Sequence, residues 1–427
     1  MNLPALEVRL QQARQLASNG DRRALAAFQD IVEQSPDCLE AQLFLSGVAM
    51  AEGRPRDALA QMRTASAQMP DNPHLRKSLA EAAAACGEID EAISALRSAV
   101  SLAPYRYDAF LLLGKLLEVR GDRHGAVRAY FRAVTRAQLA EQWLDEASIP
   151  ARLRNDVLRA MAVVEAGRTE VLASLMAPLL ERFGRDAMVR VQACFDGFLG
   201  NPVIASPEPE QKPKFLYFPD IPSRRYLDPT SLPGVDGLAA AFPAIRDEAS
   251  RLLQDGGGFQ PFLEFSSKDR PEEYLASEQG TPRWDAYFFY RHGEVFADHL
   301  AACPNTTAAL QAFPLCRIPG HAPEICFSLL APDSHILPHH GVSNIRVVVH
   351  LPLVVPHGCA LKVAGEEHAW QPGRCMVFDD TFEHEAWNRS DQPRLILLMD
   401  AWNPYLTEAE QLAMTELIEG IGEFNRG

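Results

Sequence analysis

The chain has 427 residues, 47% of them hydrophobic and 23% charged, which is ordinary for a folded protein of two or three domains. Its formal net charge of −15 argues against nucleic acid or an anionic membrane surface as a partner. No apolar run reaches the roughly 18 residues that a membrane span needs, and no basic, then apolar secretory signal is expected. The eight cysteines form no CxxC pair, so we expect free thiols and a cytoplasmic protein.

The first predicted region, residues 1–138, carries an internal repeat of 34 residues. Small or turn-forming residues recur at this spacing: Ala24, Ala58, Ala92 and Ala126; Gly53, Gly87 and Gly121; and Pro36, Pro70 and Pro104. Alanine lets paired helices approach closely, glycine relaxes the turn between them, and proline ends the second helix of each pair. The pattern resembles the tetratricopeptide repeat, which implies an all-α solenoid with a concave groove.

The groove of such a solenoid is expected to recruit a protein or peptide, either as a partner or as a substrate. The alternatives are a spacer or a dimerisation arm. Residues 139–200 keep the spacing of amphipathic helices and are predicted to cap or connect the solenoid. The Pro-rich residues 201–214 predict a linker, and a second domain is expected over residues 215–427. Its closing helix is predicted to be capped by Thr407, with Glu410 three residues further on.

Histidine is concentrated in the second domain. Eight of the 12 histidines lie between His321 and His384. Strand-like runs fill the same stretch, residues 326–403, between Gly, Pro, Asn and Asp. Because imidazole is the commonest protein ligand of transition metals, this stretch predicts metal chemistry.

The strand predicted over residues 344–351 has two different faces. Alternation places Arg346, Val348 and His350 on one face and only apolar residues on the other. A strand face that carries a cation and an imidazole is typical of the wall of a binding site. His339 precedes this strand, and His384 follows a later one. These two histidines can meet only if the sheet folds back on itself, as in barrels and jelly rolls.

Several motifs in this region follow one another in a fixed order. They are Phe218-Pro219-Asp220-x-Pro222, Trp284, Cys303-Pro304-x-Thr306, Ser328, Pro338-His339-x-Gly341, Asn344-x-Arg346, His350, Phe378-Asp379-Asp380-x-Phe382-Glu383-His384, Arg394 and Asp400-x-Trp402-x-Pro404. Together they resemble the aspartyl/asparaginyl β-hydroxylase family. The resemblance implies a double-stranded β-helix, or jelly roll, over residues 215–427, within an α+β multidomain chain.

The resemblance also implies a role for each matching residue. His339 and His384 match two iron ligands, and Gly341 stands where related oxygenases place a carboxylate ligand. Adjacent strand residues point to opposite faces, so His340 is expected to face away from the metal. Arg394 and Ser328 match residues that hold the distal carboxylate of 2-oxoglutarate, since a guanidinium pairs a carboxylate bidentately.

Three further roles concern cosubstrate and substrate. His350 matches a residue near the carboxylate of 2-oxoglutarate that chelates iron. Arg346 is expected either to contact substrate or 2-oxoglutarate or to form a structural salt bridge, and Trp284 matches a position in the substrate cleft. Two polar residues of the family are absent, because Val348 replaces an arginine and Ala286 a glutamine. Both changes remove polar groups near the expected substrate.

The two acids before His384, Asp379 and Asp380, have two possible roles. They either hydrogen-bond their own backbone in a turn or orient His384.

The predicted function is therefore that of a 2-oxoglutarate-dependent dioxygenase that uses Fe(II) and O2. The first expected substrate is an Asp or Asn residue of a protein or peptide that the repeats recruit. One alternative keeps the chemistry and changes the substrate to a small amino acid, a natural product or a lipid. Another is a repeat scaffold whose metal-binding barrel is not catalytic.

Overall fold

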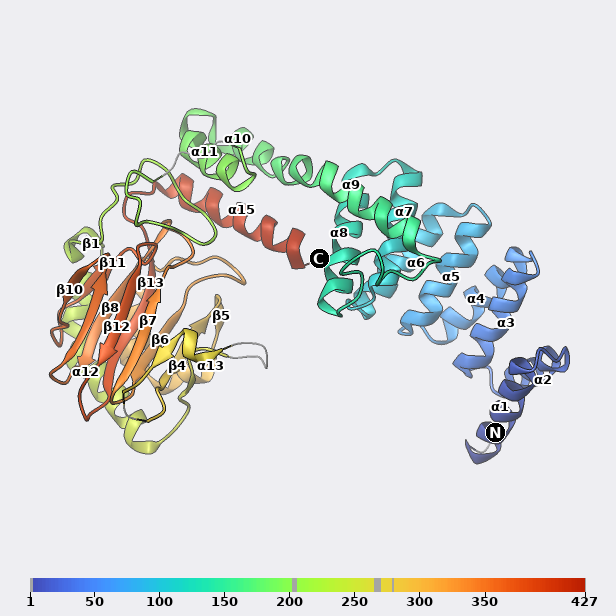
Figure 1. Ribbon diagram of the computed structural model, residues 1–427, viewed down its shortest axis with the longest axis horizontal. Helices are drawn as coiled ribbons and strands as arrows, with labels where there is room; N and C mark the ends of the chain where they lie inside the picture. Colours follow the sequence, from blue (N-terminus) through green and yellow to red (C-terminus); the bar gives the residue numbers. More distant parts are fainter. Residues whose placement is uncertain (1–2, 202–205, 265–269, 279, 427) are drawn as a thin grey trace. The chain divides into compact units, whose positions relative to one another are not determined.

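The computed structural model describes residues 3–201, 206–264, 270–278 and 280–426. The chain forms two compact units, Met1–Leu172 with Glu423–Gly427, and Ala173–Gly422. The division therefore falls within the predicted connector, residues 139–200. Figure 1 shows that the first unit is helical and that the second contains all the labelled strands. In the described ranges, no helix combines the length and hydropathy needed to cross a bilayer.

The first unit is a succession of helices, and from α1 to α8 each packs on the next along the chain. They are α1 Leu3–Ser18, α2 Arg23–Gln34, α3 Leu39–Ala51, α4 Pro55–Gln68, α5 Pro73–Ala85, α6 Ile89–Leu102, α7 Tyr107–Arg120, α8 Arg123–Leu139 and α9 Arg154–Ala173. The repeated alanines are buried among these helices, with Ala58, Ala92 and Ala126 each 0% exposed. Gly87 joins α5 to α6 with a φ of +81°, a conformation that glycine adopts without strain. The predicted helical repeats are confirmed.

The second unit begins with helices and continues into strands. Its helical elements are α10 Met176–Phe183, η1 Asp186–Met188, α11 Val189–Phe198, η2 Pro229–Ser231, α12 Val235–Asp255, η3 Pro271–Glu273, α13 Ala297–Ala302, α14 Pro304–Gln311 and α15 Glu408–Arg426. Its strands are β1 Tyr226–Leu227, β2 Gln260–Pro261, β3 Leu275–Ala276, β4 Trp284–Arg291, β5 Glu294–Val295, β6 Ile325–Leu330, β7 Ser334–His339, β8 Arg346–Val354, β9 Cys359–Val363, β10 Glu366–His368, β11 Met376–Phe378, β12 His384–Asn388 and β13 Arg394–Trp402.

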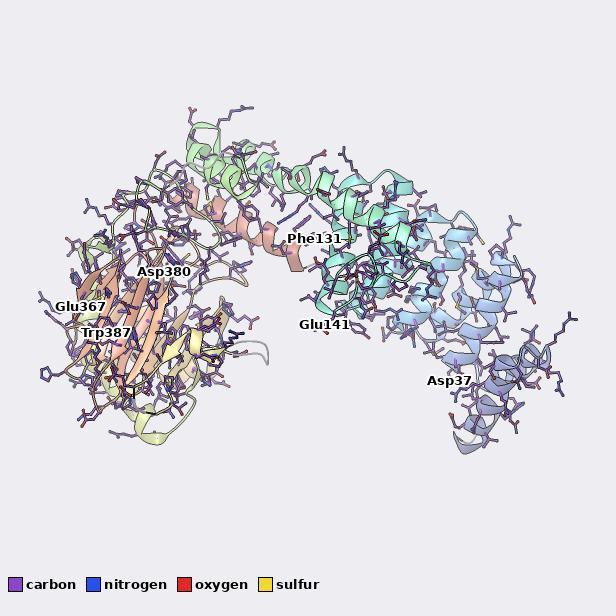
Figure 2. The ribbon with its side chains drawn as sticks, viewed as in Figure 1. Asp37, Phe131, Glu141, Glu367, Asp380 and Trp387 are labelled. Carbon is purple, nitrogen blue, oxygen red and sulfur yellow. The ribbon has the colours of Figure 1, made fainter. Side chains whose placement is uncertain are left out.

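These strands form two antiparallel sheets. The larger has the order β1-β11-β8-β13-β6-β4-β2 with β5 on β4, and the smaller has the order β10-β9-β12-β7-β3. One apolar cluster joins the sheets, because it contains Val348 and Phe378 from the larger and Ile336 and Leu361 from the smaller. Figure 2 labels Asp380 and Trp387, which are both buried among these strands.

The opposite face of the larger sheet packs against helices. Val347 and Val349 of β8 share a cluster with Leu238 and Ile245 of α12. The apolar face predicted for residues 344–351 is therefore a helix-packing face, and the face that carries Arg346 points into the space between the sheets. The prediction of a sheet-rich C-terminal domain is confirmed.

Part of the predicted linker belongs to the second unit. The Lys212 backbone N–H donates to the Thr381 carbonyl oxygen at 2.8 Å, and that of Lys214 to the Gly341 carbonyl oxygen at 3.0 Å. The Gln211 side-chain amide donates to Asp379 Oδ2 at 2.8 Å. Residues 211–214 therefore brace the loops beside the two predicted iron ligands. Residues 202–205 of the same predicted linker lie outside the described residues.

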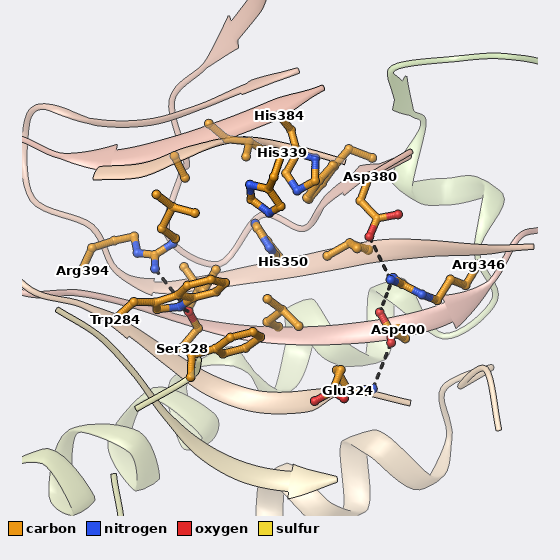
Figure 3. Close-up of a pocket in the computed structure, with 18 residues that line it drawn as sticks. Trp284, Glu324, Ser328, His339, Arg346, His350, Asp380, His384, Arg394 and Asp400 are labelled. Carbon is orange, nitrogen blue, oxygen red and sulfur yellow. Dashed lines mark hydrogen bonds and ion pairs between the residues drawn. The ribbon is translucent and has the colours of Figure 1, made fainter. Parts of the chain in front are cut away.

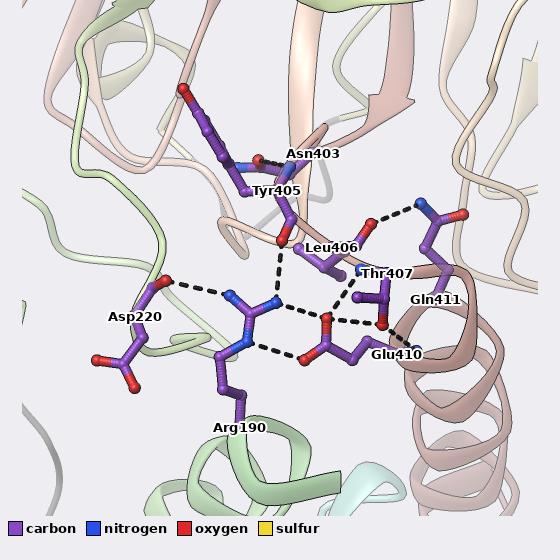
Figure 4. Close-up of polar contacts among 8 residues, drawn as sticks. All are labelled: Arg190, Asp220, Asn403, Tyr405, Leu406, Thr407, Glu410 and Gln411. Carbon is purple, nitrogen blue, oxygen red and sulfur yellow. Dashed lines mark hydrogen bonds and ion pairs between the residues drawn. The ribbon is translucent and has the colours of Figure 1, made fainter. Parts of the chain in front are cut away.

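The start of α15 has the predicted cap. Glu410 Oε2 accepts from the Thr407 backbone N–H at 2.8 Å, and the Glu410 N–H donates to Thr407 Oγ1 at 3.3 Å. Arg190 of α11 adds two bonds to the same carboxylate, at 2.8 and 2.6 Å. Its guanidinium also donates to the carbonyl oxygens of Asp220 and Tyr405, so one side chain ties three segments together (Figure 4).

Candidate functional site

A cavity of about 200 Å³ lies between the two sheets. Its walls come from β6, β8 and β13 of the larger sheet and from β7, β9 and β12 of the smaller. The predicted site residues His339, His384, His350, Arg394, Ser328, Arg346 and Trp284 all line it (Figure 3). Residues far apart in the sequence are therefore brought together around one space.

His339 and His384 lie side by side in this cavity. His339 ends β7, His384 begins β12, and the two are register partners across the smaller sheet. Their ring centroids are 4.1 Å apart. His340 lines a different pocket, with Glu383 and Lys362, as strand alternation predicts.

Hydrogen bonding sets the same tautomer in both rings. Nδ1 of His339 is 2.8 Å from the Leu337 carbonyl oxygen, and Nδ1 of His384 is 3.0 Å from the Phe382 carbonyl oxygen. Because a carbonyl oxygen can only accept, each Nδ1 carries the hydrogen and each Nε2 keeps its lone pair. Burial lowers the pKa of His339 and lowers that of His384 to about 4, so both rings are neutral at pH 7. Two neutral imidazoles with free Nε2 atoms suit a transition metal.

Donor chemistry and space both fit a metal held by two histidines. A Cβ added at Gly341 would lie 2.1 Å from Asp380 Cγ, so the Asp380 carboxylate fills the place that a side chain would need. Across the described ranges, no group of three or more His, Cys, Asp or Glu is arranged to hold a metal ion. The metal's remaining positions would therefore be open to small ligands.

His350 has the opposite tautomer. Trp370 Nε1 donates to His350 Nδ1 at 3.1 Å, and an indole N–H can only donate. Burial holds the pKa of His350 well below its usual value, so the ring is neutral and its hydrogen is on Nε2. His350 therefore offers the cavity a hydrogen-bond donor, which suits a carboxylate.

Arg394 is a buried cation with no anion beside it. The residue is 1% exposed, its Nε has no hydrogen-bond partner, and no described carboxylate forms an ion pair with it. Its Nη2 donates to Ser328 Oγ at 3.3 Å, and Trp284 Nε1 donates to the same oxygen at 2.9 Å. Burial lowers the pKa of Arg394 to about 10, so the group is still charged at pH 7. A buried charge requires a partner, and an anionic ligand such as the distal carboxylate of 2-oxoglutarate would supply it.

Arg346, in contrast, is fully engaged. Its guanidinium donates to Asp380 Oδ2 at 2.9 Å and to Asp400 Oδ1 at 2.7 Å. Burial works against the charge, but the two carboxylates raise the pKa of Arg346 above its usual value. Of the two roles expected for Arg346, this geometry favours the structural salt bridge.

Asp379 and Asp380 differ from each other. Asp379 Oδ1 accepts from the Thr381 backbone N–H at 2.9 Å and from its hydroxyl, which is the predicted turn role. The carbonyl oxygen of Phe382, not an acid, orients His384. Of the two possible roles, this geometry favours the turn for Asp379, while Asp380 is held by Arg346.

Sequence reasoning missed three residues that line or support the cavity, Asp400, Glu324 and Trp370. Strand alternation could have found the first two. Asp400 lies an even number of residues from Arg394 on β13, and Glu324 lies four residues before Ser328 of β6. No local signal marks Trp370, which lies outside the strands.

Comparison with protein families gives two matches. Residues 239–404 match the model of the Aspartyl/Asparaginyl beta-hydroxylase family. Residues 22–82 and 49–104 match the Tetratricopeptide repeat.

Curated relatives match somewhat less than half of the chain. Aspartate beta-hydroxylase domain-containing protein 2 of Mus musculus is 31% identical over 211 residues, which cover 48% of this chain and 58% of that protein. Aspartyl/asparaginyl beta-hydroxylase of Homo sapiens is 32% identical, over 42% of this chain and 22% of the human protein. Ornithine lipid ester-linked acyl 2-hydroxylase of Rhizobium tropici is 31% identical, over 43% of this chain and 62% of that enzyme. The chain thus matches less than two thirds of the length of each of these relatives.

Solved structures also match part of the chain, with low TM-scores. A crystal structure of MamA has 21% identity and a TM-score of 0.29, and covers 37% of this chain and 95% of its own. A thermophilic TPR protein of Thermus thermophilus has 22% identity and a TM-score of 0.30, and covers 44% of this chain and 96% of its own.

The family match spans the strands that carry His339, His384 and Arg394. The repeat matches lie within residues 1–138, where the 34-residue spacing occurs. Residues 239–404 are therefore similar to the aspartyl/asparaginyl β-hydroxylase family, and residues 22–104 ahead of them are similar to tetratricopeptide repeats.

Proposed function

We propose that the second unit is an iron(II)- and 2-oxoglutarate-dependent dioxygenase that hydroxylates a C–H bond. The observation that carries the proposal is the unpaired Arg394 in the same cavity as two neutral imidazoles. Family relatives that are named hydroxylases support the reaction class. We further propose that the two sheets form the double-stranded β-helix that the family resemblance implies, and that the protein is cytoplasmic.

Each site residue has a task in this reaction. His339 and His384 would hold the metal through Nε2. Arg394 and Ser328 would bind the distal carboxylate of 2-oxoglutarate, and His350 would donate Nε2–H to the carboxylate nearer the metal. When bound, iron(II) supplies the redox chemistry that inserts one oxygen atom of O2 into the C–H bond.

The overall reaction balances without a further reductant. One substrate C–H, one O2 and one 2-oxoglutarate give one alcohol, one succinate and one carbon dioxide. The oxidative decarboxylation of 2-oxoglutarate provides two electrons, and the substrate carbon provides the other two. The apolar cavity walls, which include Phe378 and Leu398, limit water near the reacting groups.

The substrate has two candidate classes. The family name points to an Asp or Asn residue of a protein or peptide, and we propose that the repeats recruit it. The second class keeps the chemistry and changes the substrate. Val348 favours this second class, because it places a methyl surface in the cavity where the family resemblance expects an arginine.

An anaerobic titration of the full chain with iron(II) and then 2-oxoglutarate tests the reaction class. We expect a weak visible charge-transfer band with the native chain and none with His384→Ala, while the helical circular dichroism of the repeats is unchanged. Binding of iron without 2-oxoglutarate, or of neither, would contradict the proposal.

A further inference from the structure

The charges that line the cavity are unevenly distributed. Five charged side chains contribute to its walls: Arg394, Arg346, Asp380, Asp400 and Glu324. Arg394 begins β13 and Asp400 lies six residues further on, roughly 20 Å away along an extended strand. Figure 3 shows the other three charged groups on the Asp400 side and the two paired histidines in between. We call the Asp380, Asp400, Glu324 and Arg346 cluster the acidic end.

The acidic end has more carboxyl groups than cationic groups. It contains three carboxyl groups and one guanidinium, and that guanidinium is bound by two of the carboxylates. Asp400 also accepts from the Glu324 backbone N–H at 2.9 Å, which fixes its second oxygen. No described cation at this end is free to receive the carboxylate of an aspartate substrate, and the surplus acids would repel it.

The same end has one acceptor atom that lacks a donor. Asp380 Oδ1 is buried and has no hydrogen-bond partner among the described residues, and the side chain is only 8% exposed. Glu324 Oε1, in contrast, accepts from the His292 backbone N–H at 2.7 Å and lies 2.7 Å from Nδ1 of the His292 ring, and its side chain is 21% exposed. An unpartnered buried acceptor beside surplus negative charge calls for a ligand that donates hydrogen bonds and carries positive charge.

The wall between the two ends is apolar. Val348, Leu398 and Phe378 line it, and Val348 is the register partner of both Phe378 and Asp400. A methylene chain can lie along this surface without leaving any of its own groups unsatisfied. The surface between the histidines and the acidic end is therefore chemically suited to an alkyl spacer.

We propose that the substrate is an aliphatic amine, in which an ammonium or guanidinium group binds the acidic end and places a methylene of its alkyl chain beside His339 and His384. This inference rests on the proposed hydroxylase function and names its substrate class. Lysine, ornithine and arginine side chains have this chemistry, whether in a peptide or as free amino acids. Glu324 is the specificity-determining residue, because it is the acid of this end that makes no ion pair with Arg346. Its ring contact is instead with His292, whose side chain is 72% exposed.

The test uses the full chain with iron(II), 2-oxoglutarate, ascorbate and O2. Three peptides differ only at a central lysine, norleucine or aspartate, so that the first two share a chain and differ in charge. Free lysine and free aspartate form two further arms, which distinguish an amino acid from a peptide substrate. Products are detected as a 16 Da mass increase, and succinate is measured in parallel.

We expect kcat/KM for a lysine substrate to exceed that for norleucine and aspartate at least about tenfold. Glu324→Gln should raise KM for lysine about tenfold and leave kcat nearly unchanged, whereas the exposed Glu294→Gln should change neither. Binding of the peptides to the metal-free chain should show the same order, which gives a readout besides turnover.

The other possible outcomes would overturn either the inferred substrate class or the proposed hydroxylase function. Hydroxylation of aspartate with equal or better kcat/KM would overturn the inference and leave the hydroxylase function standing. Equal use of lysine and norleucine, or a Glu324→Gln variant that keeps the lysine preference, would also overturn it. Loss of iron and 2-oxoglutarate binding in the native chain is a separate result, and it would overturn the proposed function itself.

Discussion

Arg394 shows how a ligand site can cost stability. The guanidinium is buried, and its Nε has no partner in the described structure. Desolvation of a charge is unfavourable unless an opposite charge compensates for it. The metal-free protein therefore retains a group that 2-oxoglutarate is proposed to satisfy.

Replacement of Arg394 by Met should separate binding from stability. Met has a similar length and no charge, so we expect 2-oxoglutarate binding to be lost while iron(II) binding changes little. The free energy of unfolding of the metal-free protein should rise by about 1–3 kcal/mol, because the unpaired charge is gone. Urea unfolding and metal titration measure the two effects. A fall in stability, as after an ordinary core truncation, would show that the guanidinium has a partner.

Glu324 predicts a specific pH dependence of stability. Burial raises its pKa from 4.5 to about 7, and the charged groups around it are Asp400, Arg291, Arg346 and the His292 ring. The folded-state pKa of Glu324 is above its unfolded value, so the protonated carboxyl group stabilises the folded protein. This contribution to the free energy of unfolding is complete below pH 4.5 and is lost as the pH rises through 7. Glu324→Gln should remove this dependence.

The size of that effect is on the order of 2 kcal/mol, after allowance for the 21% exposure of the side chain. In urea unfolding of the metal-free protein, native stability should fall between pH 5 and pH 8 more than that of Glu324→Gln. The exposed Glu294→Gln should follow the native protein. Parallel curves for the native protein and Glu324→Gln would contradict an elevated pKa at this position.

At the scale of single elements, alternation along strands was the most informative part of the sequence. It assigned Arg346, Val348 and His350 to one face of β8, and the same rule explains Arg394 and Asp400 on β13. Alternation does not say which strands pair.

The pairing of Arg346 with Asp380 and Asp400 was not predictable for that reason. It depends on the register of β13 against β8, where Asp400 is opposite Val348, and on the turn that follows β11. These contacts join positions 34 and 54 residues apart. The contacts of residues 211–214 with the loops beside His339 and His384 were not predictable either, because they also join distant parts of the sequence. A polar, Pro-rich stretch by itself indicates only a linker.

The start of α15 offers a test at the element scale. Glu410 is 3% exposed and serves both as the capping-box acid of Thr407 and as the partner of Arg190. Gln can take the capping role but not the ionic one. We therefore expect Glu410→Ala to lower the free energy of unfolding by about 3–5 kcal/mol, and Glu410→Gln by less.

Arg190→Met is the matched control for this pair. In a double-mutant cycle with Glu410→Gln, the losses should be less than additive, because both variants break the same ion pair. Chemical denaturation monitored by circular dichroism gives the four stabilities. Additive losses would mean that Arg190 acts through the carbonyl oxygens of Asp220 and Tyr405 alone.

At the scale of the whole molecule, different sequence patterns predicted the two units. The repeat period of 34 residues revealed the first unit, because each helix pair buries its alanines only against neighbours. The second unit was revealed by spaced motifs, whose meaning depends on contacts between distant strands. Every side chain that lines the candidate site belongs to the second unit, Ala173–Gly422.

Ligand binding should therefore stabilise one unit and not the other. In differential scanning calorimetry of the full chain, we expect two transitions, with manganese(II) and 2-oxoglutarate raising the temperature of one. Linkage predicts about 2.7 kcal/mol of added stability when free ligand is 100 times its Kd. His384→Ala should abolish the shift and leave the other transition in place, because His384, the proposed metal ligand, lies outside the repeats. Equal shifts of both transitions would show that the first and second units unfold together, and the proposed repeat groove would then be coupled energetically to the cavity that it is proposed to serve.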